Sequence, residues 1–527
     1  MTSTLRTPDV VASIDPATGE TWRRFDAVPA GEVPLLIESA RAAQREWARV
    51  PPRERADVVR RLRRRLFARR GDMARSITRE SGKSPVEAIG EVLLTLEFAR
   101  WYARVTPREL RRGTRAFTPA GIALARKRVR IVHEPLGVIG CISPWNYPLV
   151  LAAGVVIPAL LTGNAVVLKP SELTTASAVL LADLFREAGL PGGVLTVAPG
   201  GAETGAALVE SGTDKIFFIG SEAAGRKVAL ACAERLKPYV LELGGSDAAI
   251  VLDDADVDLA AEGIAWGRFA NAGQSCVAPK RVFVVAPIHD AFVERVTAVV
   301  HGLRVGPTAN GGDVGPVIRP RQVALLDEQL GDAMARGARV AARAAAPPAG
   351  ADAERYFLPT VLTEVSPDMR VMTEETFGPL LAVQRVRDER EAIERANATS
   401  FGLAGSVWST NHARARLVAE QLDVGAVMIN DSVTSAGMAD VPHGGNRSSG
   451  IGRSHGLAGI HECVRSKAII DDLLPMRQLW WFGYDESLLR GLDDSARMSH
   501  GPTVGERIAG ALGTARMVMA RLRGKRG

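Results

Sequence analysis

Cysteines and aromatic residues are sparse in this chain of 527 residues, and most of its basic residues are arginine rather than lysine. The four cysteines, Cys141, Cys232, Cys276 and Cys463, are too widely spaced for a metal-ligand pattern or a disulfide framework, so we expect no metal site. Aromatic residues make up only 5% of the sequence, which leaves no visible stacking platform for nucleic-acid bases. Although the net charge is +7, the densest basic stretch, residues 60–70, is typical of the polar face of an amphipathic helix. We therefore expect no nucleic-acid partner.

Long apolar runs and a leader segment are also missing. The most hydrophobic stretch, residues 138–168, is broken by Pro144, Pro148 and Pro158 and therefore fails as a membrane span. Residues 1–14 contain no apolar core of a secretory signal. These patterns predict a cytoplasmic protein, in which a reducing environment keeps cysteines as free thiols.

What the sequence does contain is a globular composition with alternating strand and helix patterns. Its length predicts two or three domains, and 46% hydrophobic with 24% charged residues is typical of a folded, soluble chain. Between residues 136 and 253, short β-rich runs alternate with helical ones, which predicts βαβ units on a parallel sheet. A second α/β segment follows residue 276, and an isolated alternating stretch near 113–133 suits a protruding hairpin. The predicted fold class is α/β, with ligands at the carboxyl ends of the strands.

Three separate motifs carry residues suited to chemistry on a carbonyl group. Cys276 ends the run Gly-Gln-Ser-Cys at residues 273–276, Glu242 lies just before two glycines, and Asn146 lies inside a Pro-Trp-Asn-Tyr-Pro turn. Each is weak evidence alone, because a single cysteine is more often a small buried hydrophobe than a nucleophile. Together, a thiol, a carboxylate and an amide can attack a carbonyl, stabilise its oxyanion and hydrolyse a thioester.

Two further motifs suit a dinucleotide. The Lys-Pro-Ser-Glu run at residues 169–172 follows a predicted strand, where its cation and carboxylate can bind the hydroxyls of an adenosine ribose. Gly220 and Ser221, with Gly225 five residues after the first, form a strand-to-helix turn whose amides can face a phosphate. The Gly-x-Gly-x-x-Gly fingerprint is absent, and by spacing alone Gly220 is interpreted equally well as a plain turn residue.

With these motifs the chain resembles the NAD(P)-dependent aldehyde dehydrogenase superfamily over nearly its full length. Matching segments stand in the family's order at residues 144–148, 169–172, 220–225, 242–245, 273–276, 374–379 and 444–450. A single match is explicable by chance, but this many in order are not. The resemblance implies a Rossmann-like NAD-binding domain, an α/β catalytic domain and a small β oligomerisation arm. The expected bounds are 1–112 with 134–245, then 246–446, and 113–133 with 460–472, followed by a C-terminal extension at 473–527.

The resemblance also implies a mechanism and its residues. Cys276 is the expected nucleophile, and Asn146 with the Cys276 backbone N–H is expected to hold the oxyanion. Hydride passes to the nicotinamide, and Glu242 then activates water to hydrolyse the thioacyl enzyme. Because a free thiol is only a few per cent ionised at neutral pH, the nucleophile needs a base or a positive local field. The matching cofactor-binding residues are Ser143, Pro144, Trp145, Lys169, Ser171, Glu172, Gly220, Ser221, Gly225, Leu243, Glu375 and Phe377.

Cofactor and substrate preferences rest on single positions. The charge of Glu172 would repel a 2′-phosphate, which favours NAD, while Lys169 pulls the other way and keeps NADP as an alternative. Succinate-semialdehyde members often carry an Arg where this chain has Ala270, so an anionic substrate has no evident partner. The neighbouring positions are small or apolar, which favours an aliphatic or aromatic aldehyde, with succinate semialdehyde as the alternative. Many members also carry a Lys and a Glu, implicated in proton relay, where this chain has Val155 and Ser454.

Two rival functions can be weighed on the same residues. CoA-acylating aldehyde dehydrogenases use the same thiol but generally lack the glutamate, so Glu242 favours hydrolysis. A non-enzymatic scaffold on this fold is expected to have lost Cys276, Glu242 or Asn146, and this chain retains all three.

The C-terminal extension departs from the family. Residues 479–482 form an apolar aromatic patch, and an arginine-flanked stripe at helical spacing follows it, made of Ile508, Leu512, Ala515, Met519 and Leu522. Such a helix can lie on an anionic membrane surface, but packing on its own enzyme or a sister subunit is the favoured interpretation. The expected location is therefore cytoplasmic, with peripheral contact at the inner face of the membrane as a hypothesis. The predicted arm and the strand at 464–470 resemble oligomerisation elements, which predicts a homodimer or homotetramer.

Overall fold

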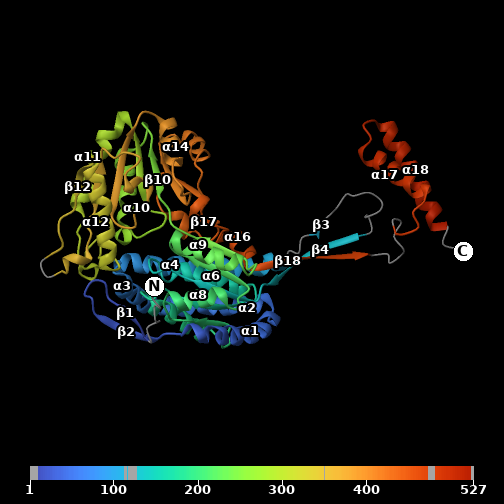
Figure 1. Ribbon diagram of the computed structural model, residues 1–527, viewed down its shortest axis with the longest axis horizontal. Helices are drawn as coiled ribbons and strands as arrows, with labels where there is room; N and C mark the ends of the chain where they lie inside the picture. Colours follow the sequence, from blue (N-terminus) through green and yellow to red (C-terminus); the bar gives the residue numbers. More distant parts are fainter. Residues whose placement is uncertain (1–9, 112–114, 117–126, 349–350, 473–480, 524–527) are drawn as a thin grey trace. The chain divides into compact units, whose positions relative to one another are not determined.

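The computed structural model describes residues 10–111, 115–116, 127–348, 351–472 and 481–523, and the chain divides into two compact units. Unit 1 spans residues 1–108 and 135–465, and unit 2 spans residues 109–134 and 466–527. Unit 1 contains two large β-sheets with helices packed around them (Figure 1). No helix in the described ranges combines the length and the apolarity that crossing a bilayer requires.

The first large sheet of unit 1 has six strands, and it is doubly wound. These are β5 (Val138–Ile142), β6 (Ala165–Lys169), β7 (Leu195–Val197), β8 (Lys215–Ile219), β9 (Tyr239–Glu242) and β17 (Gly450–Ile451). Their order is β17-β9-β8-β5-β6-β7, and only the β17–β9 pair is antiparallel. The chain runs from β5 outward to β7 and then returns to β8 on the other side. Such a reversal opens a ligand-binding crevice at the carboxyl ends of the strands.

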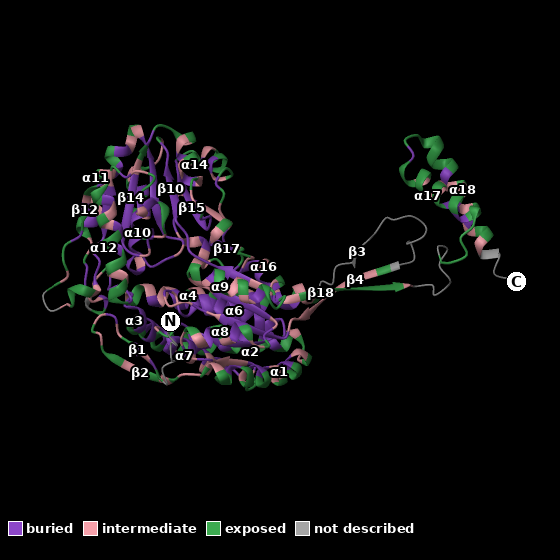
Figure 2. Ribbon diagram, in the orientation of Figure 1, coloured by how far each residue is buried: buried purple, intermediate pink, exposed green. Residues whose placement is uncertain are grey.

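Helices cover both faces of this sheet. Strand β6 shows why, because Val166 and Leu168 pack into one apolar cluster, whereas Ala165 and Val167 pack into another on the opposite face. Helix α6 lies wholly inside the first cluster, with every residue buried (Figure 2). The helices of this part are α1 (Val33–Arg49), α2 (Pro52–Ala68), α3 (Arg70–Ser81), α4 (Pro85–Arg111), α6 (Val150–Leu161), α7 (Thr175–Glu187), α8 (Ala202–Glu210) and α9 (Glu222–Ala233).

The second large sheet has seven strands in the order β12-β13-β14-β11-β10-β15-β16. All neighbours are parallel except β12 and β13, and the central strands are buried on both faces. The strands are β10 (Asp247–Val251), β11 (Pro279–Val285), β12 (Arg339–Arg343), β13 (Thr360–Thr363), β14 (Leu380–Val386), β15 (Ala404–Trp408) and β16 (Ala426–Ile429). The accompanying helices are α10 (Val257–Phe269), α11 (His289–Gly302), α12 (Pro320–Ala335), α13 (Arg370–Thr373), α14 (Glu389–Asn397), α15 (His412–Ala419) and α16 (Gly456–His461). A separate antiparallel pair, β1 (Val10–Ile14) and β2 (Thr21–Asp26), opens the described chain.

Unit 2 contains a small sheet and a helix pair. The sheet has three strands in the order β18-β4-β3, with bounds β3 (Arg115–Ala116), β4 (Lys127–Pro135) and β18 (Val464–Asp472). Helices α17 (Glu486–His500) and α18 (Val504–Arg523) pack on each other where Gly491 meets Met517, and both residues are buried, as is Leu488 of α17. The Asp485 side chain caps α17 by accepting from the Leu488 N–H at 2.8 Å.

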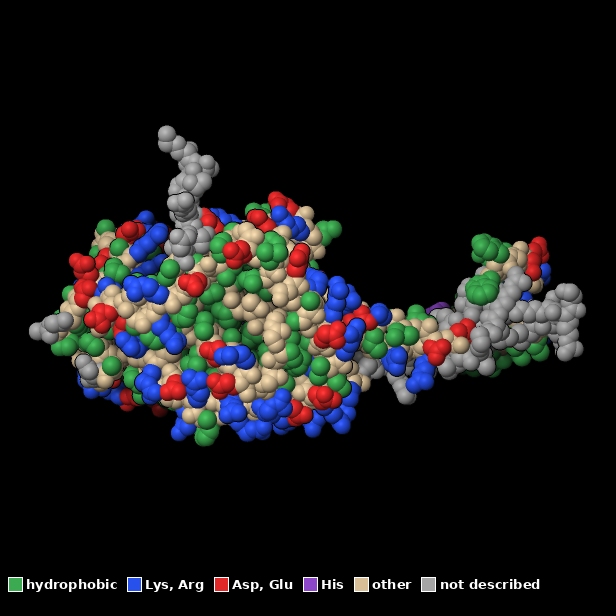
Figure 3. Space-filling model, turned by 90° about the horizontal axis from the view of Figure 1, so that it is seen from below, with side chains coloured by type: hydrophobic (Ala, Val, Ile, Leu, Met, Phe, Trp, Pro, Cys, Tyr) green, Lys and Arg blue, Asp and Glu red, His purple; other side chains and the backbone are tan. Residues whose placement is uncertain are grey.

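The predicted α/β fold class is confirmed, and the predicted strands near 138, 165, 194, 216 and 248 are found within a few residues. Strands β1, β2, β9, β12, β15 and β16 were not predicted. Residues 113–114 and 117–126 of the expected hairpin, and 479–480 of the aromatic patch, lie outside the described residues. On the face of unit 1 shown in Figure 3, basic and acidic side chains are interspersed, so that face offers no continuous basic surface.

Candidate active site

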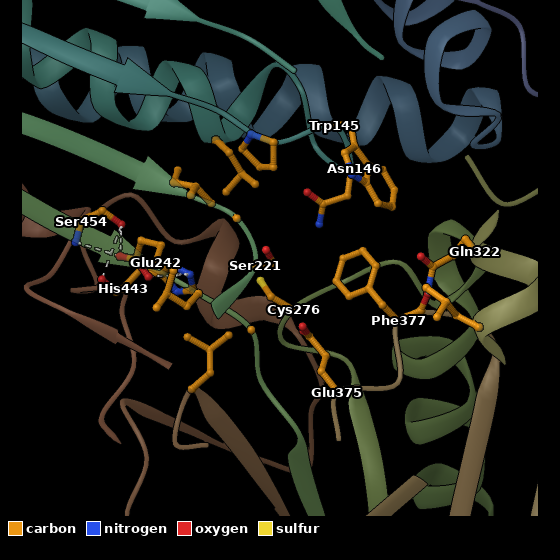
Figure 4. A pocket seen from close by; sticks show the side chains of 18 of the residues that line it. Trp145, Asn146, Ser221, Glu242, Cys276, Gln322, Glu375, Phe377, His443 and Ser454 are labelled. Carbon is orange, nitrogen blue, oxygen red and sulfur yellow. Dashed lines mark hydrogen bonds and ion pairs between the residues drawn. The ribbon is translucent and has the colours of Figure 1, made fainter. Parts of the chain in front are cut away.

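One pocket of unit 1, about 390 Å³ in volume, lies where the carboxyl edge of the first sheet meets loops of the second (Figure 4). Strand ends and loops from both sheets line it. The predicted residues on its wall are Pro144, Trp145, Asn146, Gly220, Ser221, Glu242, Leu243, Cys276, Glu375 and Phe377. The predicted residues that do not line it are Ser143, Lys169, Ser171, Glu172 and Gly225.

The loop that carries Cys276 begins with three left-handed residues. Asn271, Ala272 and Gly273 have φ values of 51°, 52° and 71°, a conformation that is unfavourable for residues other than glycine. The Gln274 side chain holds the turn, because Nε2 donates to the Asn271 carbonyl at 3.0 Å. Beyond it Cys276 is half-buried, whereas the three other cysteines are buried. Cys276 is therefore the cysteine best placed to meet a ligand in the pocket.

The thiol environment works against ionisation. Burial raises the pKa of Cys276 to about 12; the positive charge of Lys280 opposes the shift, and the carboxylates of Glu375, Asp247 and Glu242 add to it. At neutral pH the thiol is therefore protonated in the free protein. Attack on a carbonyl requires groups that stabilise the thiolate.

Asn146 lies in the turn between β5 and α6, and its side chain points into the pocket (Figure 4). Its Nδ2 donates to the Gln274 carbonyl at 3.1 Å, which ties the turn to the cysteine loop and leaves the second amide hydrogen for a ligand. The Asn146 carbonyl accepts from Lys83 Nζ at 2.8 Å, and Lys83 pairs with Glu91 at 2.8 Å with both side chains 0% exposed. The other Glu91 oxygen accepts from the Leu149 N–H at 2.8 Å. The turn is thus held by a buried ion pair that no sequence motif singled out.

Glu242 ends β9 and is buried beside the pocket. Its Oε1 accepts from the Ser454 hydroxyl at 2.8 Å and from the Ser454 N–H at 3.2 Å. Its Oε2 lies 3.9 Å from His443 Nε2 and has no hydrogen bond among the described residues. Burial raises the pKa of Glu242 to about 8, while the hydrogen bonds from Ser454 and the charge of Arg453 oppose the shift. A base with a pKa near the working pH suits general catalysis.

Two histidines stand behind this carboxyl group. The rings of His443 and His455 are stacked with 5.2 Å between their centroids. Burial lowers the pKa of His443 to about 4, so its imidazole is neutral at pH 7. His443 lines the pocket, and only its position directly before the predicted Gly444–Gly445 motif could have drawn attention to it.

The opposite wall of the pocket is suited to a dinucleotide. Glu375 Oε1 accepts from the Gly245 N–H at 3.0 Å, and the Phe377 ring meets Trp145 edge to face with 5.4 Å between centroids. The side chain of Ser221 caps α9 at the carboxyl end of β8. The N-terminal amides of α9 therefore lie beside the pocket, in the arrangement that binds phosphate groups.

The Lys-Pro-Ser-Glu motif lies at the end of β6, along the same sheet edge. Lys169 Nζ is 3.8 Å from Glu172 Oε2, with Lys169 buried and the Glu172 side chain 49% exposed. Burial lowers the pKa of Lys169, and the charge of Glu172 opposes the shift. A cation and a carboxylate side by side can bind the two hydroxyls of a ribose, as expected from the motif.

Several lining residues escaped sequence reasoning. Leu151 and Leu403 are apolar and carry no chemical signal, and Arg319, Gln322 and Leu325 come from the start of α12. Of the three positions at which this chain departs from the family's usual residues, only one lies at the pocket. Ser454 contacts Glu242 and lines the pocket, whereas neither Val155, which is buried in α6, nor Ala270, which follows α10, does so.

Residues 4–469 match the model of the Aldehyde dehydrogenase family. The chain belongs to that family. A succinate-semialdehyde dehydrogenase [NADP(+)] from Deinococcus radiodurans is 40% identical, over 87% of this chain and 94% of the relative. A 4,4′-diapolycopene aldehyde oxidase from Methylomonas is 36% identical, over 85% of this chain and 83% of the relative. Among solved structures, betaine aldehyde dehydrogenase from Staphylococcus aureus in complex with NAD+ is 30% identical with a TM-score of 0.85, covering 90% of this chain and 94% of that one.

The family match assigns the protein to a family of oxidoreductases that use NAD or NADP. It ends at residue 469, so helices α17 and α18 lie beyond the aldehyde dehydrogenase part of the chain.

Proposed function

We propose that this family member oxidises an aldehyde to the carboxylic acid with NAD(P)+, using Cys276 as nucleophile, Glu242 as general base and Asn146 as oxyanion donor. The observation that carries the proposal is that these three side chains line the same pocket, together with Glu375 and Phe377. The residues present fit the cofactor. Amides at the start of α9 suit its diphosphate, the Glu375 carboxylate suits a ribose, and the Phe377 ring suits the nicotinamide.

Each step can be written on the residues of this chain. The Cys276 thiol releases its proton to solvent, the thiolate sulfur attacks the aldehyde carbon, and the resulting oxyanion accepts hydrogen bonds from Asn146 Nδ2 and the Cys276 N–H. When bound, the cofactor supplies the hydride acceptor that oxidises this adduct to a thioester. Glu242 then takes a proton from the water whose oxygen attacks the thioester carbon. The C–S bond breaks, the acid leaves and the thiol is restored.

For the cofactor we propose NAD rather than NADP, because Glu172 places a negative charge beside the expected ribose site. The Deinococcus relative is named as NADP-dependent and the Staphylococcus structure contains NAD+, so relatives support both. We expect Glu172→Ser to raise kcat/KM with NADP relative to NAD by about tenfold, the change in selectivity that removing one repulsive charge brings. Steady-state kinetics with both cofactors measure this ratio, and an unchanged ratio would contradict the assignment.

For the substrate we propose an apolar aldehyde, since Leu151, Leu403 and Phe377 line the pocket that holds Cys276. The Methylomonas relative, named a 4,4′-diapolycopene aldehyde oxidase, supports this choice. The Deinococcus relative supports a second candidate, a carboxylated semialdehyde. Arg319 is the cation on the pocket wall that could bind such a carboxylate.

The experiment is NADH and NADPH formation across short, long, aromatic and carboxylated aldehydes, with and without CoA. We expect acid formation without CoA and the highest kcat/KM for an apolar aldehyde. Turnover that requires CoA would favour the acylating reaction instead, and a preference for succinate semialdehyde would favour the second candidate. Cys276→Ser in parallel should abolish turnover, and substantial residual rate would refute the nucleophile.

We also propose that the three-stranded sheet is an assembly element of a homodimer or homotetramer. For the helix pair α17–α18 we propose a contact outside its own two-helix core. Val504, Ile508, Leu512 and Met519 are exposed along one side of α18, which supports such a contact. Anionic liposome sedimentation and native mass measurements on the full chain and on a chain lacking residues 478–527 test it. Loss of liposome binding would indicate a membrane surface, loss of the oligomer would indicate a subunit contact, and no change in either would refute the contact.

A further inference from the structure

Lys280 lies four residues after Cys276 in the sequence, at the start of β11. Its side chain is buried, with 1% exposed. Nζ donates to the carbonyls of Cys276 at 2.7 Å, Ser275 at 3.0 Å and Ala278 at 3.2 Å. The ammonium group thus uses its three donors on three backbone carbonyls of the cysteine loop, and only the protonated amine carries three hydrogens.

No ion pair of Lys280 is found among the residues that the structure describes, in contrast to Lys83, which pairs with Glu91. A buried ammonium group without a contacting carboxylate costs free energy, and carbonyl dipoles compensate only part of that cost. Lys237 provides a matched case elsewhere in unit 1. It is also buried, and its Nζ donates to the carbonyls of Val209 and Ser211 and to the Thr213 hydroxyl, but none of these residues lines the pocket, whereas Lys280 donates to the carbonyl of the pocket residue Cys276.

We propose that Lys280 is a positioning residue that supplies the positive charge by which the Cys276 thiolate is stabilised for attack. The proposal rests on the proposed function in one respect, that Cys276 is the nucleophile. Lys280 does not line the pocket, so its atoms are not expected to touch substrate or cofactor. It acts by holding the loop and by its charge.

The charges around the thiol make this role necessary. Of the groups that shift the pKa of Cys276, Lys280 is the cation, and it faces the opposing carboxylates of Glu375, Asp247 and Glu242. The pKa of Lys280 itself is lowered by burial, and Asp247 and Glu375 oppose that shift while Arg268 adds to it. Without the Lys280 charge, the Cys276 thiolate would be left with the repulsion of these carboxylates, which raises the pKa of the thiol. Removing the Asp247 charge should lower that pKa.

The effect of the Lys280 charge can be separated from that of its hydrogen bonds to the loop by the choice of substitutions. Lys280→Gln keeps N–H donors for the loop carbonyls but removes the charge. Asp247→Asn removes a negative charge and keeps the carbonyl oxygen that accepts from the Ala404 N–H. Lys237→Gln is the matched control, since it removes a buried ammonium that also bonds to carbonyls, but away from the pocket.

The readout is the rate of alkylation by iodoacetamide as a function of pH, measured on the folded, full-length protein. Cys276 is the one half-buried cysteine, the other three being buried, and Cys276→Ser gives the background rate. We expect Lys280→Gln to raise the apparent pKa of the reacting thiol by about one unit, which is about a tenfold lower rate at pH 7. Asp247→Asn should shift the apparent pKa downward, and Lys237→Gln should leave it unchanged.

A folded Lys280→Gln protein with the wild-type alkylation profile would overturn the proposal. If that variant does not fold, Asp247→Asn decides, because an unshifted or upward-shifted profile shows that charges at this distance do not govern the thiol. Alkylation needs no turnover, so its result is independent of the substrate and of hydrolysis. A failure of Cys276→Ser to abolish turnover would instead count against the proposed function.

Discussion

Around the pocket of unit 1, charged side chains are buried and hydrogen-bonded: Lys83 pairs with Glu91, and Lys280 donates to three backbone carbonyls. In the helix pair of unit 2 it is apolar side chains that face solvent, with Ile508 and Leu512 each 58% exposed. Buried charge is costly and persists where chemistry uses it, whereas an exposed apolar row indicates a contact still to be made. The first region is therefore expected to act by itself, and the second only with a partner.

The largest expected effect concerns the chemistry of the pocket and leaves the helix pair of unit 2 unaffected. Glu242→Gln should slow hydrolysis of the thioacyl enzyme about 10²–10³-fold, because the base that activates water is removed. The first turnover should still release a burst of NADH, since hydride transfer precedes hydrolysis. Stopped-flow absorbance at 340 nm separates the two phases, and an equal loss in both would contradict the role of Glu242. A chain lacking residues 478–527 should show both phases at the wild-type rate.

The same carboxyl group predicts a pH dependence. Burial raises the pKa of Glu242 to about 8, and only the ionised carboxylate can accept the proton of water. The hydrolysis rate should therefore rise with pH through about 8 and then level off. In Glu242→Gln this rise should vanish, and a hydrolysis rate that instead fell over this range would refute the assignment.

A smaller effect is expected on the free energy of unfolding, and it should differ between the two regions. Ile250 is 0% exposed in the core of the second sheet, so Ile250→Ala should lower the free energy of unfolding by about 2–5 kcal/mol. Leu512 is largely exposed, so Leu512→Ala should change it by less than about 0.5 kcal/mol. Urea unfolding followed by circular dichroism measures both. A cost for Leu512→Ala near that of the core residue would mean that this face of α18 is already covered in the free protein.

The two regions also differ in what the sequence could predict. Cys276, Glu242 and Asn146 belong to separate motifs. Because strand ends meet at one edge of a parallel sheet, the α/β fold explains why Asn146, after β5, and Glu242, at the end of β9, lie at the same edge. Cys276 precedes β11 of the second sheet, and only the family resemblance linked it to the other two. Strand β9 was missed although Glu242 ends it, since Tyr-Val-Leu-Glu is too short a run for periodicity to register. Lys83, Glu91 and Lys280 could not be selected either. Their roles arise from contacts over long sequence separations or with backbone carbonyls, which leave no trace in residue type.

For the helix pair, the sequence pattern predicted the apolar stripe on α18 but not the surface that covers it. The apolar spacing predicted a helix, and the structure shows that Met517 meets Gly491 of α17, whereas Ile508, Leu512 and Met519 of the predicted stripe are exposed. An amphipathic pattern identifies a face that needs covering, not the molecule that covers it. The assignment of α17–α18 therefore depends on binding measurements, whereas that of the pocket depends on kinetics.

The smallest effect concerns His443, which stands between pocket and protein interior. Its Nε2 lies 3.9 Å from the Glu242 oxygen that has no hydrogen bond among the described residues, and its imidazole is neutral at pH 7. A neutral N–H donor favours the carboxylate, so His443→Phe should raise the pKa of Glu242 further above its ordinary value, by less than about one unit. Hydrolysis should then be about threefold slower at pH 7 and unchanged at pH 9.5, where the carboxylate is ionised in both proteins. His412→Phe, at an exposed position on α15, is the control. A downward shift, or an equal loss at both pH values, would show that His443 shapes the pocket without setting the charge of Glu242.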